Sequence, residues 1–200
     1  MNQAIRILRD EHRAIAAVLH GLQRLARIAS EGSLVPDFRV FFAMIYYIDA
    51  FPERLHHPKE EVFLFDRLQA RTHAADRIIA ELRAEHVLGA HLIRDIEQAL
   101  VHFEASGPAG AQQFASAVER FAQFHWDHMR KEEDQLLPLA MSHLEAEDWN
   151  EIASAFAANP DPIGDAAEKE DFEELYTRIA TLAPAPIGLG DPWRRNAERT

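Results

Sequence analysis

A short motif that occurs twice restricts the fold of this chain more than any other feature of its sequence. The motif His-x-x-Lys-Glu-Glu begins at His56 and again at His128, and an apolar run follows each copy. A shorter echo, Glu-His, ends at His12 and again at His86. The order along the chain is therefore His, His-x-x-x-Glu, His, His-x-x-x-Glu. This duplication predicts two equivalent helix pairs.

Hydrophobic periodicity places the motifs on four long helices. Apolar residues at helical spacing predict helices over about residues 3–30, 37–71, 72–105 and 109–142. Pro52 and Pro58 interrupt the second helix, which we expect to be one bent helix or two abutting pieces. Four long helices joined by short loops predict an all-α fold, an up-down-up-down four-helix bundle.

The predicted bundle covers residues 1–144, and smaller elements follow it. Residues 145–182 are expected to form a C-terminal helical extension that packs on the bundle. It contains short helices over 145–158 and 165–182, separated by an Asn-Pro-Asp-Pro turn at 159–162. Residues 183–200 are rich in proline and glycine and predict a flexible tail. A chain of 200 residues is consistent with a single domain.

The amino-acid composition and net charge argue against several classes of function. The formal net charge of -12 argues against nucleic acid and membrane surfaces as partners. The absence of cysteine excludes disulfides, thiolate zinc sites, iron–sulfur clusters and thiol catalysis. No apolar stretch suits a membrane span or a signal peptide, so we expect a cytoplasmic protein. The 11 histidines remain as the main candidates for chemistry.

The spacing His-x-x-x-Glu has a physical meaning on a helix. Residues four apart differ by only about 40° around the helix axis and lie one turn apart on one face. His56 with Glu60, and His128 with Glu132, can each present an imidazole and a carboxylate to one point. In a four-helix bundle, the single histidines of the first and third helices add nitrogens from the other walls.

Such a set of inward donors predicts a bound cation. Burying six ionisable groups without partners would be costly, and metal ions would compensate them. Nitrogen and carboxylate oxygen donors without thiolate suit iron or manganese better than calcium. A single His-x-x-x-Glu pair is expected on an ordinary solvated helix face. Two copies on alternate helices, with one histidine on each remaining helix, favour metal binding.

Two stretches, HHPKEEVFLFDRL and HWDHMRKEEDQLLPLA, resemble the hemerythrin-like (HHE cation-binding) family, and the resemblance covers about residues 3–142. It implies two non-haem iron ions bridged by carboxylates, with manganese or zinc as substitutes in recombinant material. The ligands that the resemblance implies are His12, His56, Glu60, His86, His128 and Glu132. The two glutamates are the expected bridges between the irons.

One departure from the family bears on function. The oxygen-carrying members have five histidines, two of them four residues apart on the third helix, and an aspartate that closes the last motif. Here Ala90 lies four residues after His86, and His91 is turned away from it by about 140°. The chain therefore resembles the four-histidine branch, which is associated with iron sensing or with repair of iron centres under nitrosative or oxidative stress. We expect an open coordination position on one iron and no reversible oxygen transport.

The remaining candidates receive lesser roles. His125, one turn before His128, is expected to be a fifth nitrogen or, preferably, a hydrogen-bonding neighbour of a ligand. His57 is expected to face solvent. Glu61 and Glu133 follow ligands in sequence but point off the ligand face, so they are expected at the surface or hydrogen-bonded to ligands.

Three classes of function fit these features. The first is a binding protein whose di-iron centre binds or senses oxygen, nitric oxide, peroxide or iron. The second is a di-iron enzyme of the peroxidase, oxidase or nitric oxide reductase type, or one that repairs iron centres; ferritin-type oxidases are disfavoured because their motif runs Glu-x-x-His. The third is a scaffold whose C-terminal helices dock a protein partner that the sequence does not identify.

Overall fold

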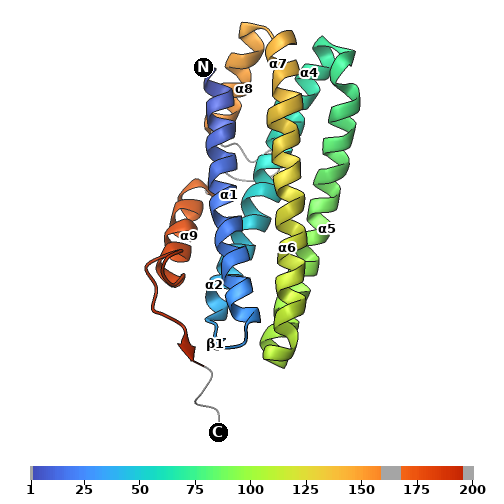
Figure 1. Ribbon diagram of the computed structural model, residues 1–200. Coiled ribbons are helices and arrows are strands. Elements are labelled where there is room, and N and C mark those ends of the chain that lie inside the picture. Colours follow the sequence, from blue (N-terminus) through green and yellow to red (C-terminus); the bar gives the residue numbers. More distant parts are fainter. Residues whose placement is uncertain (1, 159–167, 196–200) are drawn as a thin grey trace.

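The structure is a computed structural model that describes residues 2–158 and 168–195, without the side chains of residues 168–173. Four helical arms stand side by side and alternate in direction (Figure 1). Arm 1 is α1 (Gln3–Ser30) and arm 3 is α5 (Asp76–Ser106), which follows a short 3-10 turn, η3 (His73–Ala75). Arm 2 consists of α2 (Phe38–Ile48), η1 (Asp49–His56), α3 (His57–Lys59), η2 (Glu60–Phe65) and α4 (Asp66–Arg71). Arm 4 consists of α6 (Pro108–Lys131), η4 (Glu132–Leu136) and α7 (Leu137–His143). The predicted all-α bundle is confirmed.

Local sequence explains where the arms begin and turn. The side chain of Asn2 accepts a hydrogen bond from the backbone N–H of Ala4 and caps α1, and Asp37 caps α2 in the same way. Gly107, with φ of 61°, and Pro108 form the sharp connection between α5 and α6. A positive φ suits glycine, and the fixed φ of proline suits the first turn of a helix.

Arm 2 is helical without a break from Phe38 to Arg71, so the structure shows one helix rather than two abutting pieces. The segments η1, η2 and η4 are π-helical, with wider turns than an α-helix. Pro52 lies inside η1, where the wider turn accommodates a residue that lacks an N–H donor. His56 ends η1, Glu60 begins η2 and Glu132 begins η4, so both duplicated motifs lie at such turns.

The core consists of two apolar clusters with a polar layer between them. The cluster near the start of α1 packs Leu8, Leu82 and Leu136 together with residues of α8 (Ala146–Ala158). The cluster towards the other end of the bundle packs Ile15 and Phe121 with residues of α2 and α5. Apolar burial on both sides stabilises the bundle and confines the polar layer to its middle.

The C-terminal extension packs on the bundle. Helix α8 contacts α1 and η2, and α9 (Glu168–Leu182) contacts α2. The two-residue strands β1 (Leu34–Val35) and β2 (Arg194–Arg195) pair in antiparallel register. Trp193 lies 5.7 Å from the ring of Phe41, so the segment 183–195 of the predicted flexible tail lies against the bundle. The predicted turn at 159–162, the start of the helix expected at 165, and residues 196–200 lie outside the described residues.

No helix in the described ranges combines the length and the apolar character needed to cross a membrane.

Candidate metal centre

The polar layer brings together all six residues that were predicted as ligands, and every one of them is buried. They come from all four arms: His12 from arm 1, His56 and Glu60 from arm 2, His86 from arm 3, and His128 and Glu132 from arm 4. The exposed fractions of these residues do not exceed 7%, so water contributes little to their solvation. Their charges and polar atoms must be compensated from within the protein.

Glu60 and Glu132 each divide their two oxygens between two pairs of histidines. Glu60 Oε1 lies 3.4 Å from His56 Nε2 and 3.9 Å from His12 Nε2, while Glu60 Oε2 lies 3.7 Å from His86 Nε2. Glu132 Oε1 lies 3.2 Å from His128 Nε2 and 4.0 Å from His86 Nε2, while Glu132 Oε2 lies 3.2 Å from His12 Nε2. Both carboxylates therefore face both histidine pairs.

The donors form two overlapping groups. We call His12 and His56 the first half of the centre, and His86 and His128 the second half. Together with Glu60 and Glu132, each half forms a group of four buried residues whose donor atoms all lie within 4.8 Å of one another. Because bonds from first-row metals to nitrogen and oxygen are about 2.0–2.2 Å long, donors of one ion lie roughly 3 Å apart. The nitrogen–oxygen separations of 3.2–4.0 Å are slightly wider than this, and they leave room for one ion in each half with both carboxylates shared.

Each of the four histidines in the two halves has its Nδ1 atom hydrogen-bonded to a glutamate. The bonds from histidine Nδ1 to carboxylate oxygen are His12 to Glu133 (3.0 Å), His56 to Glu11 (2.7 Å), His86 to Glu61 (2.7 Å) and His128 to Glu85 (3.0 Å). A carboxylate that accepts from Nδ1 fixes the ring orientation and leaves Nε2 free to face the centre. Each glutamate lies on a different arm from its histidine, so the pairs also tie the arms together.

Sequence reasoning anticipated this role for two of the four glutamates and missed it for the others. Glu61 and Glu133 were expected at the surface or hydrogen-bonded to ligands, and the structure shows the second. Glu11 and Glu85 are the glutamates of the Glu-His echo, and the sequence pattern predicts no role for them. Their signal was the Glu-His echo, since each glutamate binds the histidine of the next arm along the chain.

The lysines of the duplicated motif complete the arrangement. Lys59 Nζ donates to Glu11 Oε1 at 2.7 Å, and Lys131 donates to Glu85 in the same way. The four fixed positions of His-x-x-Lys-Glu-Glu thus perform the same tasks in both copies. If arms 1 and 2 are exchanged with arms 3 and 4, each of these histidine–glutamate and lysine–glutamate contacts is replaced by its equivalent from the other copy.

The electrostatics of the protein side chains favour a cation at the centre. Burial would lower the pKa of His12 and His128, but Glu132 and other carboxylates outweigh it; the pKa of His12 lies well above its ordinary value and that of His128 is about 10. Burial would raise the pKa of Glu132, yet His128 and His12 hold it well below its ordinary value. Both oxygens of Glu60 and of Glu132, and Nε2 of His12, His86 and His128, are buried without a hydrogen bond. Metal ions would satisfy these atoms in place of protons.

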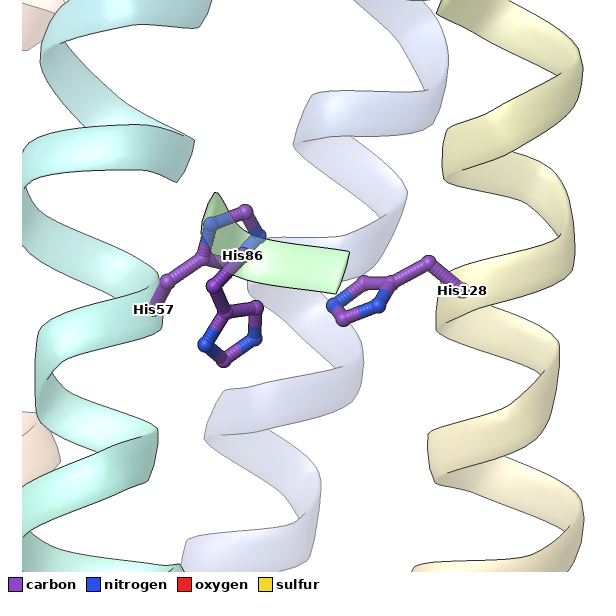
Figure 2. A group of neighbouring side chains, drawn as sticks. All are labelled: His57, His86 and His128. Atoms are coloured by element: carbon purple, nitrogen blue, oxygen red, sulfur yellow. The ribbon is translucent and has the colours of Figure 1, made fainter. Parts of the chain in front are cut away.

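The prediction that His57 faces solvent is wrong, because its exposed fraction is 4%. The imidazoles of His57, His86 and His128 converge in the space between the arms (Figure 2). The ring of His57 stacks on that of His86, with centroids 4.1 Å apart and planes 8° apart. The π-helical turn that ends at His56 changes which face its neighbour presents, which a regular helical wheel does not anticipate.

His125 is also buried, and it faces Glu53 rather than any of the six central residues. Its Nε2 lies 3.3 Å from Glu53 Oε1, and His57 Nδ1 lies 3.6 Å from Glu53 Oε2. Burial would raise the pKa of Glu53, but the two imidazoles outweigh it and hold this pKa at about 2. Burial lowers the pKa of both histidines. His91 is exposed on α5.

Comparison with known proteins gives a family match over most of the chain. Residues 3–140 match the family model of the hemerythrin HHE cation binding domain, and they contain all six central residues. A search of curated proteins finds no match. The matched region runs from the start of α1 into α7, and on this basis the chain belongs to the hemerythrin HHE cation-binding family.

Proposed function

We propose that this protein is a non-haem di-iron protein that binds a small ligand, such as oxygen, nitric oxide or peroxide, or senses iron. The observation that carries the proposal is the division of each carboxylate between the two histidine pairs. Glu60 and Glu132 would bridge the two ions, while each half would supply two imidazole nitrogens.

The donor set suits iron and leaves room for a ligand. Each ion would have two nitrogens and two carboxylate oxygens from the protein, which is fewer than the six positions of an octahedral ion. When bound, an iron pair supplies reversible redox chemistry and open positions for diatomic or peroxide ligands. The second of the two third-helix histidines of the oxygen carriers is absent, because Ala90 occupies the corresponding position on α5.

The residues of the chain itself orient and isolate the centre. The four glutamates behind the histidines fix the imidazole rings and raise their basicity as ligands. The apolar clusters on either side limit access of water along the bundle axis. The second half has the more exposed surroundings, since the side chains of Glu85 and Lys131 are each 23% exposed, and we infer that a small ligand enters there.

Anaerobic reconstitution with ferrous iron tests the proposal. Wild-type protein should bind at least two irons per chain, and exposure to air should produce an absorption band from ligand-to-metal charge transfer. Glu132→Ala should lose two irons relative to wild type, because both ions share this carboxylate. His56→Ala should lose or weaken the iron of the first half.

His91→Ala is the matched control, because it removes an exposed histidine from α5. It should retain the iron content and the absorption band of wild type. Wild-type protein that takes up no iron, or a Glu132→Ala protein with an unchanged iron content, would contradict the proposal.

The unfilled coordination positions also favour a second candidate, a di-iron enzyme of the peroxidase or nitric oxide reductase type, or one that repairs iron centres under stress. The two candidates differ in turnover. Iron-loaded protein that consumes many equivalents of peroxide or nitric oxide per chain, with a reductant present, would establish the enzyme. Binding of one equivalent without further consumption would establish the binding protein.

A further inference from the structure

A second group of buried donors lies beside the second half of the centre. Glu53, His57 and His125 each offer one donor atom, and these atoms all lie within 4.8 Å of one another. Glu53 and His57 lie four residues apart on arm 2, while His125 comes from α6. None of the three is among the six central residues.

Three polar atoms of this group lack hydrogen-bond partners, as do the atoms of Glu60 and Glu132 in the centre. Across the described ranges, buried side-chain oxygens and imidazole nitrogens without a hydrogen bond occur only in the centre and in this group. Here they are Glu53 Oε1, His57 Nδ1 and His125 Nε2. The contacts of Glu53 with the two imidazoles, at 3.3 and 3.6 Å, do not have the geometry of hydrogen bonds. Since an unsatisfied buried polar group is destabilising, three at one point indicate a shared partner.

A glycine on α5 makes room for the carboxylate of this group. A Cβ atom at Gly89 would lie 2.9 Å from Glu53 Oε1, closer than real contacts allow, and 3.1 Å from Glu53 Oε2, so the carboxylate would have to shift. Glycine inside a helix is less favourable than alanine. The helix therefore gives up stability at the position where the carboxylate needs space.

The two imidazoles are held rigidly by aromatic neighbours. The ring of His125 packs against Phe121 at 4.4 Å and Phe124 at 5.4 Å between centroids. The ring of His57 stacks on that of His86, with planes 8° apart, and its centroid lies 5.9 Å from that of His125, with planes 12° apart. Rigid donors in an apolar setting favour metal binding because little side-chain entropy remains to be lost.

We propose that Glu53, His57 and His125 form a third metal site, which binds one divalent ion of a first-row transition metal. Two imidazoles and one carboxylate are a donor set with which proteins hold Fe²⁺ or Zn²⁺. Three protein donors leave open positions for water or a small ligand. The site does not rest on the proposed di-iron function, because it shares no residue with the six central ones.

Zinc, which has no redox chemistry, is the probe for this site. After equilibrium dialysis and elemental analysis, wild-type protein should hold three zinc ions per chain and Glu53→Gln should hold two. The double variant Glu60→Ala/Glu132→Ala, which lacks both shared carboxylates of the centre, should hold one. A zinc-edge anomalous peak between Glu53, His57 and His125 should locate the ion.

Gly89→Ala is a second, independent test of the site, in case Glu53→Gln loses zinc only because it folds poorly. This substitution removes no donor and favours the helix, but its Cβ would displace the carboxylate of Glu53. One zinc ion should therefore again be lost. The helical circular dichroism should be the same as that of wild type. Equal zinc contents in wild type, Glu53→Gln and Gly89→Ala, or a site without an anomalous peak, would show that the group is only a chain of polar contacts and would overturn the proposal. One zinc ion in both wild type and the double variant would contradict the di-iron centre and leave the third site standing.

Discussion

The two halves of the centre have the same donors but different surroundings. In the first half, Lys59 is fully buried and pairs with Glu11, whose side chain is 12% exposed. Helix α8 lies over this pair, with the ring of Phe156 5.0 Å from Lys59 Nζ. In the second half, the equivalent Lys131 and Glu85 are each 23% exposed. A duplicated motif therefore specifies the donors, while α8, which has no counterpart in the duplication, covers the lysine–glutamate pair of the first half.

The largest expected effect concerns the protons that each half holds in the metal-free protein. The pKa of His128 is raised to about 10, and that of His12 is raised in the same direction. A histidine with a raised pKa in the folded state stabilises the protein fully below its unfolded value near 6.5, and this contribution is lost as the pH rises through the folded value. Between pH 7 and pH 10 the free energy of unfolding should therefore fall by roughly 3–5 kcal/mol.

Urea unfolding of chelator-treated protein at several pH values measures this effect. His12→Gln and His128→Gln should each make the pH dependence shallower, and equal changes would mean that the two halves are electrostatically equivalent. Stability that stays constant or rises between pH 7 and pH 10 would show that the carboxylates do not hold these protons.

The two lysines test the difference in burial directly. Removing one partner of a buried ion pair costs about 3–5 kcal/mol, whereas an exposed pair contributes about 1 kcal/mol or less. Lys59→Met should therefore destabilise the protein by about 3 kcal/mol, and Lys131→Met by about 1 kcal/mol or less. Thermal and urea unfolding at pH 7 compare the two variants. Equal losses would mean that the cover provided by α8 has no energetic consequence.

The smallest expected effect is on metal affinity. Replacing a carboxylate behind a metal-binding histidine reduces metal affinity by about 10- to 100-fold. Glu11→Gln should lie near the upper end of this range and Glu85→Gln near the lower, because water can replace the lost acceptor at the more exposed position. Competition with a chromophoric chelator gives both affinities. A larger loss for Glu85→Gln would reverse the proposed order of the two halves.

How much of this arrangement the sequence predicts depends on whether a contact is local. The four arms follow from hydrophobic periodicity, and the pairing of His56 with Glu60 follows from helical spacing, since both depend on neighbours along the chain. Whether His12 meets Glu133 or Glu61 depends on how the arms pack, and spacing within one helix contains no such information. The burial of His57 was missed because it depends on a π-helical turn that periodicity does not reveal.

The partition of donors between the arms has a consequence for assembly. Arms 1 and 2 together supply two imidazoles and one shared carboxylate, and arms 3 and 4 supply the same set. An exchange of two equivalent halves is the operation of a two-fold axis, the commonest symmetry of protein dimers. Two identical helical hairpins of about half this length, meeting face to face, would thus assemble a full complement of donors, and covalent linkage lets one hairpin diverge from the other.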